Sequence, residues 1–389
     1  MLVRDQYGEG MFVVGFGTYD STRHPRIAVL LEGLRAHGDT VVEVNEPLGF
    51  STAERVRMLR RPAGSGRLLW RLASRWRALI RASRPVRNGP PPDAVVVGYL
   101  GHFDVVLARL LFRNRLIVLD QLVFGADTAS DRGVRSPLKK GLLTLLDRIA
   151  VRCADLVVLD TEEHRALLPR RRRGDAVVVP VGAAARWFAA RRELAPPASG
   201  VALAEERPIR VLFYGLFTPL QGTLTIARAL ALLTGTDGVQ LTMVGDGQDR
   251  PRARELAAGN PQVRWLDWVE PAELVELVAE HDVCLGVFGT TPKGQRVVPN
   301  KAYQGAAAGC AVITSDTQAQ RRMLGDGALY VAAGDAPALA AALRLLAADP
   351  ELLRRYRLQA RERADLAFTP HAVVGPLRTR IDELSILAG

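Results

Sequence analysis

The 389-residue sequence predicts an α/β protein built from two consecutive doubly wound parallel sheets. The chain is long enough for two domains that each bury a core. Short, almost wholly apolar strands alternate with helical patterns, which is typical of parallel sheets covered on both faces. Two such series are separated by residues 194–206, which have neither the helical nor the strand period and therefore indicate a linker.

The first series begins with an apolar strand at residues 12–17, which ends in a glycine-containing loop. A helix with apolar positions from Ile27 to Leu34 and a second strand at residues 40–44 follow, so the segment predicts a βαβ unit. Further apolar strands are expected at residues 94–98, 116–119, 156–159 and 176–179. We therefore assign residues 1–193 to an N-terminal domain.

The second series predicts a domain over residues 207–370. Its strands are expected at residues 211–215, 241–245, 263–266, 283–287 and 311–314. Helices are expected at residues 223–233 and 271–280, and the pattern from Pro337 to about Asp365 is strongly helical until Pro370 breaks it. A last amphipathic segment, residues 371–389, closes the chain.

Composition narrows the class of protein. Apolar residues make up 48% and charged residues 24%, as in globular chains. No apolar run is long enough to cross a bilayer and the N-terminus lacks the apolar region of a signal peptide, so we expect a cytoplasmic protein. Three scattered cysteines without a CxxC spacing predict neither a disulfide framework nor a zinc site. No Asp-x-Asp motif is present, so a metal held by that motif is not indicated.

The net charge of +11 is concentrated in the N-terminal half. Residues 1–200 hold 32 of the 52 Lys and Arg but only 20 of the 41 Asp and Glu, which leaves a balance of −1 for residues 201–389. Residues 67–81 combine an apolar helical stripe, two tryptophans and several arginines. They suit either a surface helix packed on the core or a basic helix lying on an anionic membrane at its cytoplasmic face. Nucleic acid is disfavoured, because no recognition helix or aromatic platform accompanies the charge.

Two glycine-containing strand ends in the second domain, residues 214–222 and 244–247, could hold an anion at a following helix N-terminus. Each could equally be an ordinary turn. The more informative segment is 288–314, in which a strand, a polar loop, Pro299-Asn300-Lys301, a helix, Gly309 and a buried strand follow one another. Asn300 is expected to cap that helix. A lysine in its first turn opposes the helix dipole, and a bound anion would remove the conflict.

This order of elements resembles the retaining glycosyltransferases of family 4, whose fold is GT-B with two Rossmann-like domains facing across a cleft. The segments at 178–182, 210–222, 244–247 and 263–269 extend the resemblance. It implies that the C-terminal domain binds a nucleotide-sugar donor, that an acceptor binds the N-terminal domain, and that the closing helix crosses back to that domain. The donor-binding residues that we predict are Gly17, Gly215, Gln221, Gly222, Gly245, Asp246, Trp268, Lys293, Arg296, Pro299, Asn300, Lys301 and Gln304.

The sequence departs from the family's pattern at four positions. The family has an Arg and a Lys where this chain has Leu216 and Gln221, and two Glu where it has Arg296 and Gln304. Gln304 can still bond ribose hydroxyls, though without a charge-assisted hydrogen bond. The charge of the diphosphate would then be met by Lys293, Arg296 and Lys301 instead.

In the first domain, His102 and Asp104 follow an apolar strand directly, and Asp120 ends the next strand. The resemblance implies that a His near this position contacts the sugar or the departing phosphate, so we predict His102, Asp104 and Asp120 as catalytic residues. Asp20, His24 and Asp127 are the predicted acceptor-binding residues. For all of them a structural role, such as capping a turn, is the alternative.

The prediction is therefore a hexosyltransferase that needs no cofactor or metal and moves a sugar from a nucleoside diphosphate to a small or lipid-linked acceptor, with retention of configuration. A front-face displacement needs no strong protein nucleophile. The alternatives are a nucleotide-sugar epimerase of the same fold and a catalytically silent binding or scaffold protein. A Rossmann dehydrogenase is disfavoured because no GxGxxG opens a helix.

Overall fold

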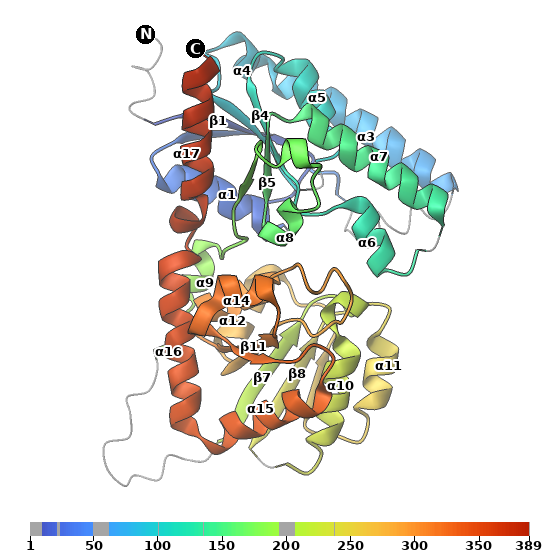
Figure 1. Cartoon of the computed structure of the whole chain (residues 1–389), viewed down its shortest axis with the longest axis vertical. Coiled ribbons are helices and arrows are strands. Elements are labelled where there is room, and N and C mark those ends of the chain that lie inside the picture. Colours follow the sequence, from blue (N-terminus) through green and yellow to red (C-terminus); the bar gives the residue numbers. More distant parts are fainter. Residues whose placement is uncertain are drawn as a thin grey trace.

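The computed structural model describes residues 10–21, 24–49, 62–99, 101–134, 136–193, 207–236 and 238–388. It contains two six-stranded parallel sheets, one above the other in Figure 1. The first has the order β2-β1-β3-β4-β5-β6 and the second β12-β11-β10-β7-β8-β9. The expected fold class, two doubly wound α/β units, is confirmed. The predicted linker, residues 194–206, lies outside the described residues.

The N-terminal sheet consists of β1 (Phe12–Gly17), β2 (Thr40–Asn45), β3 (Ala94–Val97), β4 (Leu116–Asp120), β5 (Leu156–Leu159) and β6 (Ala176–Val178). Its helices are α1 (Pro25–Ala36), α3 (Pro62–Ala82), α4 (Arg84–Asn88), α5 (Asp104–Leu111), α6 (Gly125–Asp131), α7 (Pro137–Cys153), α8 (Glu162–Arg165) and α9 (Ala185–Ala189). Residues of α3, α5 and α7 bury apolar side chains against one face of the sheet, and α1 covers the other.

The C-terminal sheet consists of β7 (Ile209–Tyr214), β8 (Val239–Val244), β9 (Val263–Leu266), β10 (Val283–Leu285), β11 (Ala311–Ser315) and β12 (Leu329–Val331). Its helices are α10 (Thr223–Leu232), α11 (Arg250–Leu256), α12 (Pro271–Ala279), α13 (Asn300–Ala308), α14 (Gln318–Leu324), α15 (Ala336–Ala348) and α16 (Pro350–Ala367). Residues of α10, α11 and α15 cover one face, whereas α12, α13 and α16 cover the other.

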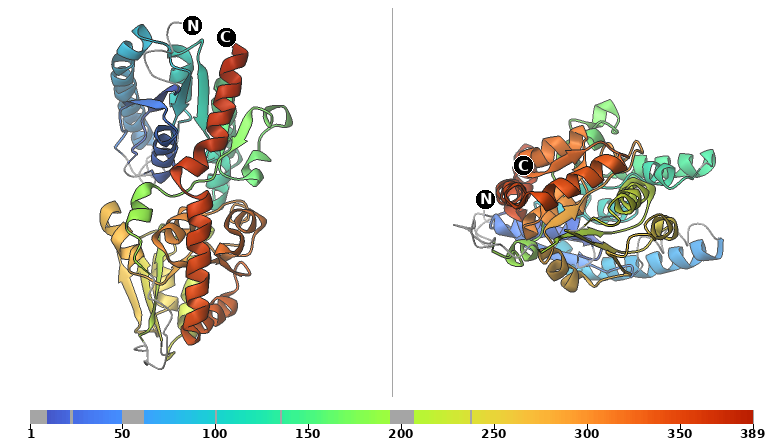
Figure 2. Two further views of the ribbon diagram at one scale, coloured as in Figure 1. Left: turned by 90° about the vertical axis from the view of Figure 1, so that its left-hand side faces the viewer. Right: turned by 90° about the horizontal axis from the view of Figure 1, so that it is seen from below.

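The last helix, α17 (Pro370–Ala388), returns from the C-terminal unit to the N-terminal one, as Figures 1 and 2 show. Val374, Leu377 and Ile381 are buried and share a hydrophobic cluster with Leu30 and Leu34 of α1. The same cluster runs through the contact between the two units and into α13 and α16. The two sheets therefore share one apolar core along this side of the molecule.

Two local expectations need correction, and one strand was not expected. The helical stretch 337–365 is two helices, because Asp349 caps a new helix that begins at Pro350. The short strand β12 was not expected. Asn300 does not cap α13: Pro299 occupies the N-cap and Asn300 is the first helical residue.

Candidate functional site

A cavity of about 470 Å³ lies between the two sheets, at the carboxyl ends of their strands. Its volume is within the range of small-molecule sites. One wall comes from the C-terminal unit and contains nine of the predicted donor-binding residues: Gly215, Gln221, Gly245, Trp268, Lys293, Pro299, Asn300, Lys301 and Gln304. The other wall comes from the N-terminal unit, with Pro25, Tyr99, Leu122, Val123, Asp160, His164 and Val181.

Glycines allow the backbone of the C-terminal wall to pack closely. A Cβ on Gly245, whose φ is +119°, would lie 2.1 Å from the carbonyl oxygen of Gly215. Gly222, with a φ of +64°, lies outside the cavity lining, and a Cβ there would lie 2.3 Å from the carbonyl carbon of Phe288. Both positions require glycine because L-residues avoid these angles and the space is already filled. The glycines thereby bring the ends of β7, β8 and β10 together around the cavity.

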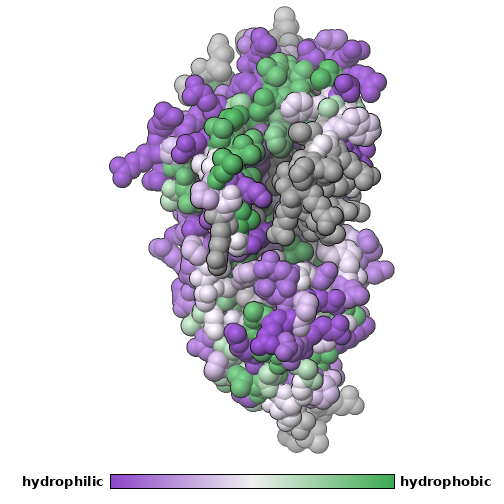
Figure 3. Space-filling view, turned by 90° about the vertical axis from the view of Figure 1, so that its right-hand side faces the viewer, coloured by the Kyte–Doolittle hydropathy of each residue, from purple (hydrophilic) through white to green (hydrophobic). Residues whose placement is uncertain are grey.

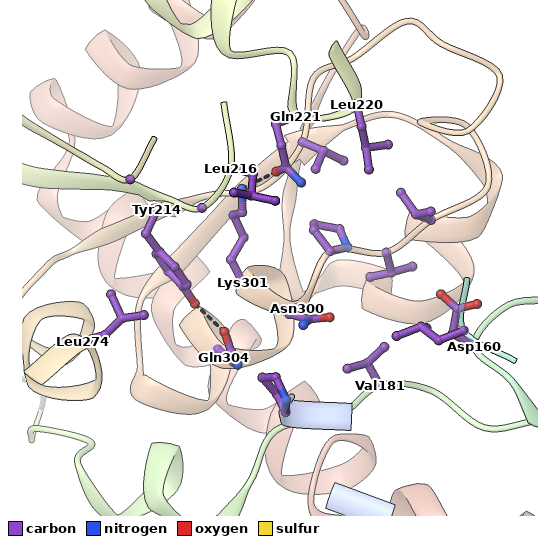
Figure 4. A pocket seen from close by; sticks show the side chains of 18 of the residues that line it. Asp160, Val181, Tyr214, Leu216, Leu220, Gln221, Leu274, Asn300, Lys301 and Gln304 are labelled. Atoms are coloured by element: carbon purple, nitrogen blue, oxygen red, sulfur yellow. Dashed lines mark hydrogen bonds between the residues drawn. The ribbon is translucent and has the colours of Figure 1, made fainter. Parts of the chain in front are cut away.

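Lys301 extends from the first turn of α13 toward the loop after β7 (Figure 4). Its Nζ donates a hydrogen bond to Oε1 of Gln221 and lies 3.8 Å from the centroid of the Phe213 ring. The side chain is buried and forms no ion pair among the described residues. Burial lowers the pKa of Lys301 to about 7. A group in this state takes up a proton readily when an anion enters the cavity.

Gln304 lies one turn after Lys301 on the same side of α13. Its Oε1 accepts a hydrogen bond of 2.8 Å from the hydroxyl of Tyr214, at the end of β7. The amide orientation that this bond fixes leaves Nε2 as a donor beside the cavity. Asn300 and Pro299 line the cavity at the start of the helix.

The loop between β10 and α13 contacts α6 of the N-terminal unit. Arg296 forms an ion pair with Asp127, and Nζ of Lys293 donates to Oγ1 of Thr128 at 2.7 Å. Lys293 lines the cavity and burial lowers its pKa, whereas Arg296 does not line it. The structure therefore pairs a predicted donor ligand, Arg296, with a predicted acceptor ligand, Asp127.

None of the three predicted catalytic residues is among the residues that line the cavity. His102 Nε2 lies 2.8 Å from Oδ1 of Asp147 on α7. Asp104 is buried, and its carboxylate accepts hydrogen bonds from Thr18 and from Nε1 of Trp76.

Asp120 is also buried, where it pairs with Arg26 at 3.1 Å. Burial raises the pKa of Asp120, against the opposing effect of Arg26.

The remaining predicted residues lie at the edges of the site. Gly17 is next to Asp104, and a Cβ on it would lie 3.1 Å from Oδ2 of that carboxylate. The backbone N–H of Asp20 donates a hydrogen bond to Nδ1 of His24. The centroid of the His24 ring lies 4.6 Å from that of Tyr99, which lines the cavity. Asp246 is exposed, and its carbonyl accepts from the amide of Phe217.

The sequence interpretation missed several residues of the cavity lining. Asp160 and His164 come from the end of β5 and from α8, and Arg186 comes from α9. A carboxylate directly after a buried strand, followed by a histidine four residues later, was the signal for the first two. Arg186 follows no strand end and gave no such signal.

Two further observations bear on the site. Among the described residues, no group of three His, Cys, Asp or Glu side chains could hold a metal ion. In the same part of the chain, no helix is long and apolar enough to cross a membrane.

Solved structures define the fold as GT-B. Sucrose-phosphate synthase of Thermosynechococcus elongatus superimposes with a TM-score of 0.69 at 16% identity, covering 97% of this chain and 100% of the other. The Anabaena protein HepE, solved in complex with UDP, gives 0.61 at 12% identity, with 96% and 99% covered. A Listeria monocytogenes protein assigned as a UDP-N-acetylglucosamine 2-epimerase gives 0.54 at 12% identity, with 97% of each chain covered. At these identities the likeness shows the fold alone.

Sequence comparisons concern the C-terminal unit. Residues 208–349 match the model of the family described as Glycosyl transferases group 1, which supports that family for this chain. A phosphatidyl-myo-inositol mannosyltransferase of Mycobacterium leprae is 35% identical over 163 residues, which are 38% of this chain and 42% of the relative. The match thus spans less than half of the relative's length.

Proposed function

We propose that the protein is a glycosyltransferase that uses a nucleotide-sugar donor. One observation carries the proposal: within the part of the chain that matches the glycosyltransferase family, residues 208–349, two glycine turns and the first turn of α13 form one wall of the cavity between the sheets. In open α/β sheets, ligands bind at the carboxyl ends of the strands.

The donor's diphosphate would bind at the N-terminus of α13. Helix N-termini present free N–H groups and a positive partial charge to anions, and Lys301 adds a cation in the same place. Nζ of Lys301 reaches Gln221, in the loop where family 4 enzymes have a lysine. Lys301 would therefore supply that charge from a different element. Nε2 of Gln304 is placed to bond a ribose hydroxyl.

We further propose transfer with retention of configuration and without a metal ion. The leaving diphosphate would be stabilised by Lys301, backbone N–H groups and the helix dipole, which act strongly in a site that excludes water. A front-face displacement lets the departing phosphate accept the proton of the attacking hydroxyl, so it needs no protein nucleophile. Measurement of the product's anomeric configuration by NMR tests retention, and activity in excess EDTA tests metal independence.

The acceptor that we propose is a polyol lipid, with the N-terminal unit resting on an anionic membrane. The mannosyltransferase relative acts, by its name, on phosphatidyl-myo-inositol. On α3, within the predicted membrane segment 67–81, Leu79 is buried in the core and Trp76 packs against it, whereas Trp70 is 70% exposed. A second set of exposed apolar side chains lies on α7, at one-turn spacing and with basic neighbours: Leu138, Leu142, Leu145 and Ile149, beside Lys139, Arg148 and Arg152. Hydrophobic side chains also gather over the N-terminal unit in Figure 3.

Two alternatives have some support. An epimerase is one alternative, because the fold is shared with a protein assigned as an epimerase. A catalytically silent scaffold protein is the other, because Leu216 and Gln221 stand where family 4 has an Arg and a Lys. The first test is a thermal-shift screen of the full chain against UDP, GDP and ADP. A panel of UDP-, GDP- and ADP-sugars is then incubated with vesicles containing phosphatidyl-myo-inositol. Labelled sugar in the lipid supports the proposal, interconversion of the free nucleotide-sugar favours the epimerase, and no shift with any nucleotide refutes a donor site.

A further inference from the structure

Asp160 and His164 form a buried acidic-basic pair in the wall of the cavity. The proposed function gives this pair no role. Asp160 directly follows β5, and Thr161 caps α8 by accepting a hydrogen bond from the backbone N–H of His164. The chain therefore turns so that His164 Nδ1 lies 2.5 Å from Oδ1 of Asp160. The side chains are only 2% and 4% exposed for His164 and Asp160 respectively, yet both line the cavity.

The pair fixes the tautomer of the imidazole. An ionised carboxylate only accepts hydrogen bonds, so Nδ1 of His164 carries the proton and donates it to Asp160. In the neutral ring, Nε2 is then an acceptor. Within the described part of the chain, neither Nε2 of His164 nor Oδ2 of Asp160 has a hydrogen-bond partner, and His164 is the residue with which Asp160 pairs.

Such a pair selects a particular ligand chemistry. An acceptor atom on the ring and a nearby carboxylate favour a hydroxyl group and repel a phosphate. The opposite wall has the reverse character, with Lys301 and the N-terminus of α13 (Figure 4). The cavity thus has a donor-rich wall suited to an anion and an acceptor-rich patch suited to a hydroxyl.

We propose that Nε2 of His164 binds the attacking hydroxyl of the sugar acceptor and that Asp160 positions the ring. This inference rests on the proposed function and adds the acceptor subsite to it. Thr161 links the subsite to the donor side, because its hydroxyl donates at 2.8 Å to the carbonyl oxygen of Arg296 in the loop before α13.

Variants of His164 test the subsite in the full chain. His164→Leu fills the same space without an acceptor atom, whereas His164→Gln keeps an amide oxygen near the Nε2 position. We expect His164→Leu to raise the apparent KM for phosphatidyl-myo-inositol in vesicles, or to lower kcat, by about tenfold or more, and His164→Gln to recover part of the loss. Asp160→Asn should resemble His164→Leu. The amide of the introduced asparagine can donate a hydrogen bond to Nδ1, which moves the ring proton to Nε2 and removes the acceptor there. The melting-temperature shift given by the nucleoside diphosphate should be unchanged in all three.

A matched control is His281→Leu. His281 is also a buried histidine, but its ring nitrogens contact Leu277 and Thr242 away from the cavity, so its loss should affect stability and not the acceptor KM. Normal acceptor kinetics in folded His164→Leu would overturn the proposal. So would a raised KM for the nucleotide-sugar with an unchanged acceptor KM, since His164 would then bind the donor.

A second measurement separates this inference from the proposed function. Histidine side chains labelled with ¹⁵N are observed by NMR while myo-inositol is added in the presence of saturating UDP. Movement of the His164 Nε2 resonance, assigned with His164→Gln, supports hydroxyl binding even if no sugar transfer is found, in which case only the proposed function fails. Sugar transfer to the lipid with a resonance that does not respond to the polyol overturns the subsite alone.

Discussion

Lys301 combines burial with a position at the start of a helix, where both the desolvation of its charge and the helix dipole disfavour the ammonium form. Its hydrogen bond to Gln221 and its contact with the Phe213 ring hold the side chain in place without neutralising a charge. The position is therefore poor for a structural lysine and good for one that meets an anion.

The affinity for the nucleoside diphosphate should fall as the pH rises. With its pKa at about 7, Lys301 is largely protonated at pH 6 and largely neutral at pH 8.5 in the unliganded protein. Binding an anion requires the proton, so the affinity should fall by up to about tenfold per pH unit above 7. Calorimetric titration at several pH values measures this. Lys301→Arg should bind with little pH dependence, because guanidinium stays charged, and an equally steep fall in that variant would contradict the assignment.

Lys301 should also leave a signature in the pH dependence of stability. Its pKa is lowered in the folded protein from 10.5 to about 7, so between these values the unfolded chain binds more protons and the free energy of unfolding rises with pH. Relative to Lys301→Met, the wild type should therefore gain stability between pH 7 and pH 9. Urea unfolding of both proteins at the two pH values measures the difference. A constant difference would mean that the lysine keeps its ordinary pKa when folded.

At the level of elements, Gly222 sets how closely the loop after β7 approaches the end of β10. Gly222→Ala would combine the cost of a left-handed residue with a steric clash, because the added Cβ would lie only 2.3 Å from the carbonyl carbon of Phe288. We expect a loss of about 2–4 kcal/mol of stability, with weaker nucleotide binding, because Gln221 and the loop to α13 must shift.

Gly235→Ala is the control, because Gly235 has a similar φ of +72° but no atom within 4 Å of the added Cβ. It should cost about 1 kcal/mol, the conformational cost alone. Denaturant unfolding of the two variants measures the overlap as the difference between them. Equal losses would show that the close contact with Phe288 relaxes freely.

The exposed face of α7 should carry membrane binding. Replacing Leu142, which is 59% exposed, by Glu removes apolar area and adds a negative charge, so binding to vesicles with 30% phosphatidylserine should weaken about tenfold or more. Leu366→Glu makes the same change at a leucine that is 73% exposed on α16 and should have no effect. Vesicle co-sedimentation compares the two. An equal loss of vesicle binding in both variants would show that the change in net charge, and not the surface of α7, weakens binding.

The strands could be predicted from the sequence because each is a short apolar run bounded by polar loops, as at residues 156–159, where the observed β5 has the expected bounds. The break between α15 and α16 was missed because Asp349-Pro350 lies within a continuous helical pattern. That Lys301 and Gln304 line the cavity could be predicted, because both lie in one continuous segment of the sequence, 288–314. In the N-terminal unit, the sequence alone could not show that His102 contacts Asp147 or that Asp120 forms an ion pair with Arg26. Each of these contacts joins segments that are far apart in the sequence.

At the scale of the whole molecule, the two units meet through contacts of opposite kinds. Along α16 and α17 the contact is apolar, and one hydrophobic cluster runs through it into both units. At α6 the contact between the units is polar and consists of side-chain contacts with the loop before α13. In one of them the hydroxyl of Thr291 donates a hydrogen bond of 2.7 Å to Oδ1 of Asp131. Polar contacts at a partly exposed edge separate more easily than a shared core. Domain opening should therefore begin at α6 and pivot about the helical side.

The pair Arg296 and Asp127 tests whether that edge acts as a latch or as a ligand site. Both side chains are about one-fifth exposed and contact each other, so a latch predicts that Asp127→Ala, Arg296→Ala and the double variant have similar effects, with a coupling of about 1 kcal/mol. Each variant should enlarge the radius of gyration in X-ray scattering without nucleotide and raise the donor KM a few-fold. If Arg296 bound the diphosphate directly, Arg296→Ala would lower nucleotide affinity well beyond Asp127→Ala. We expect equal effects, because Arg296 lies outside the cavity lining whereas Lys293, on the same loop, is part of it.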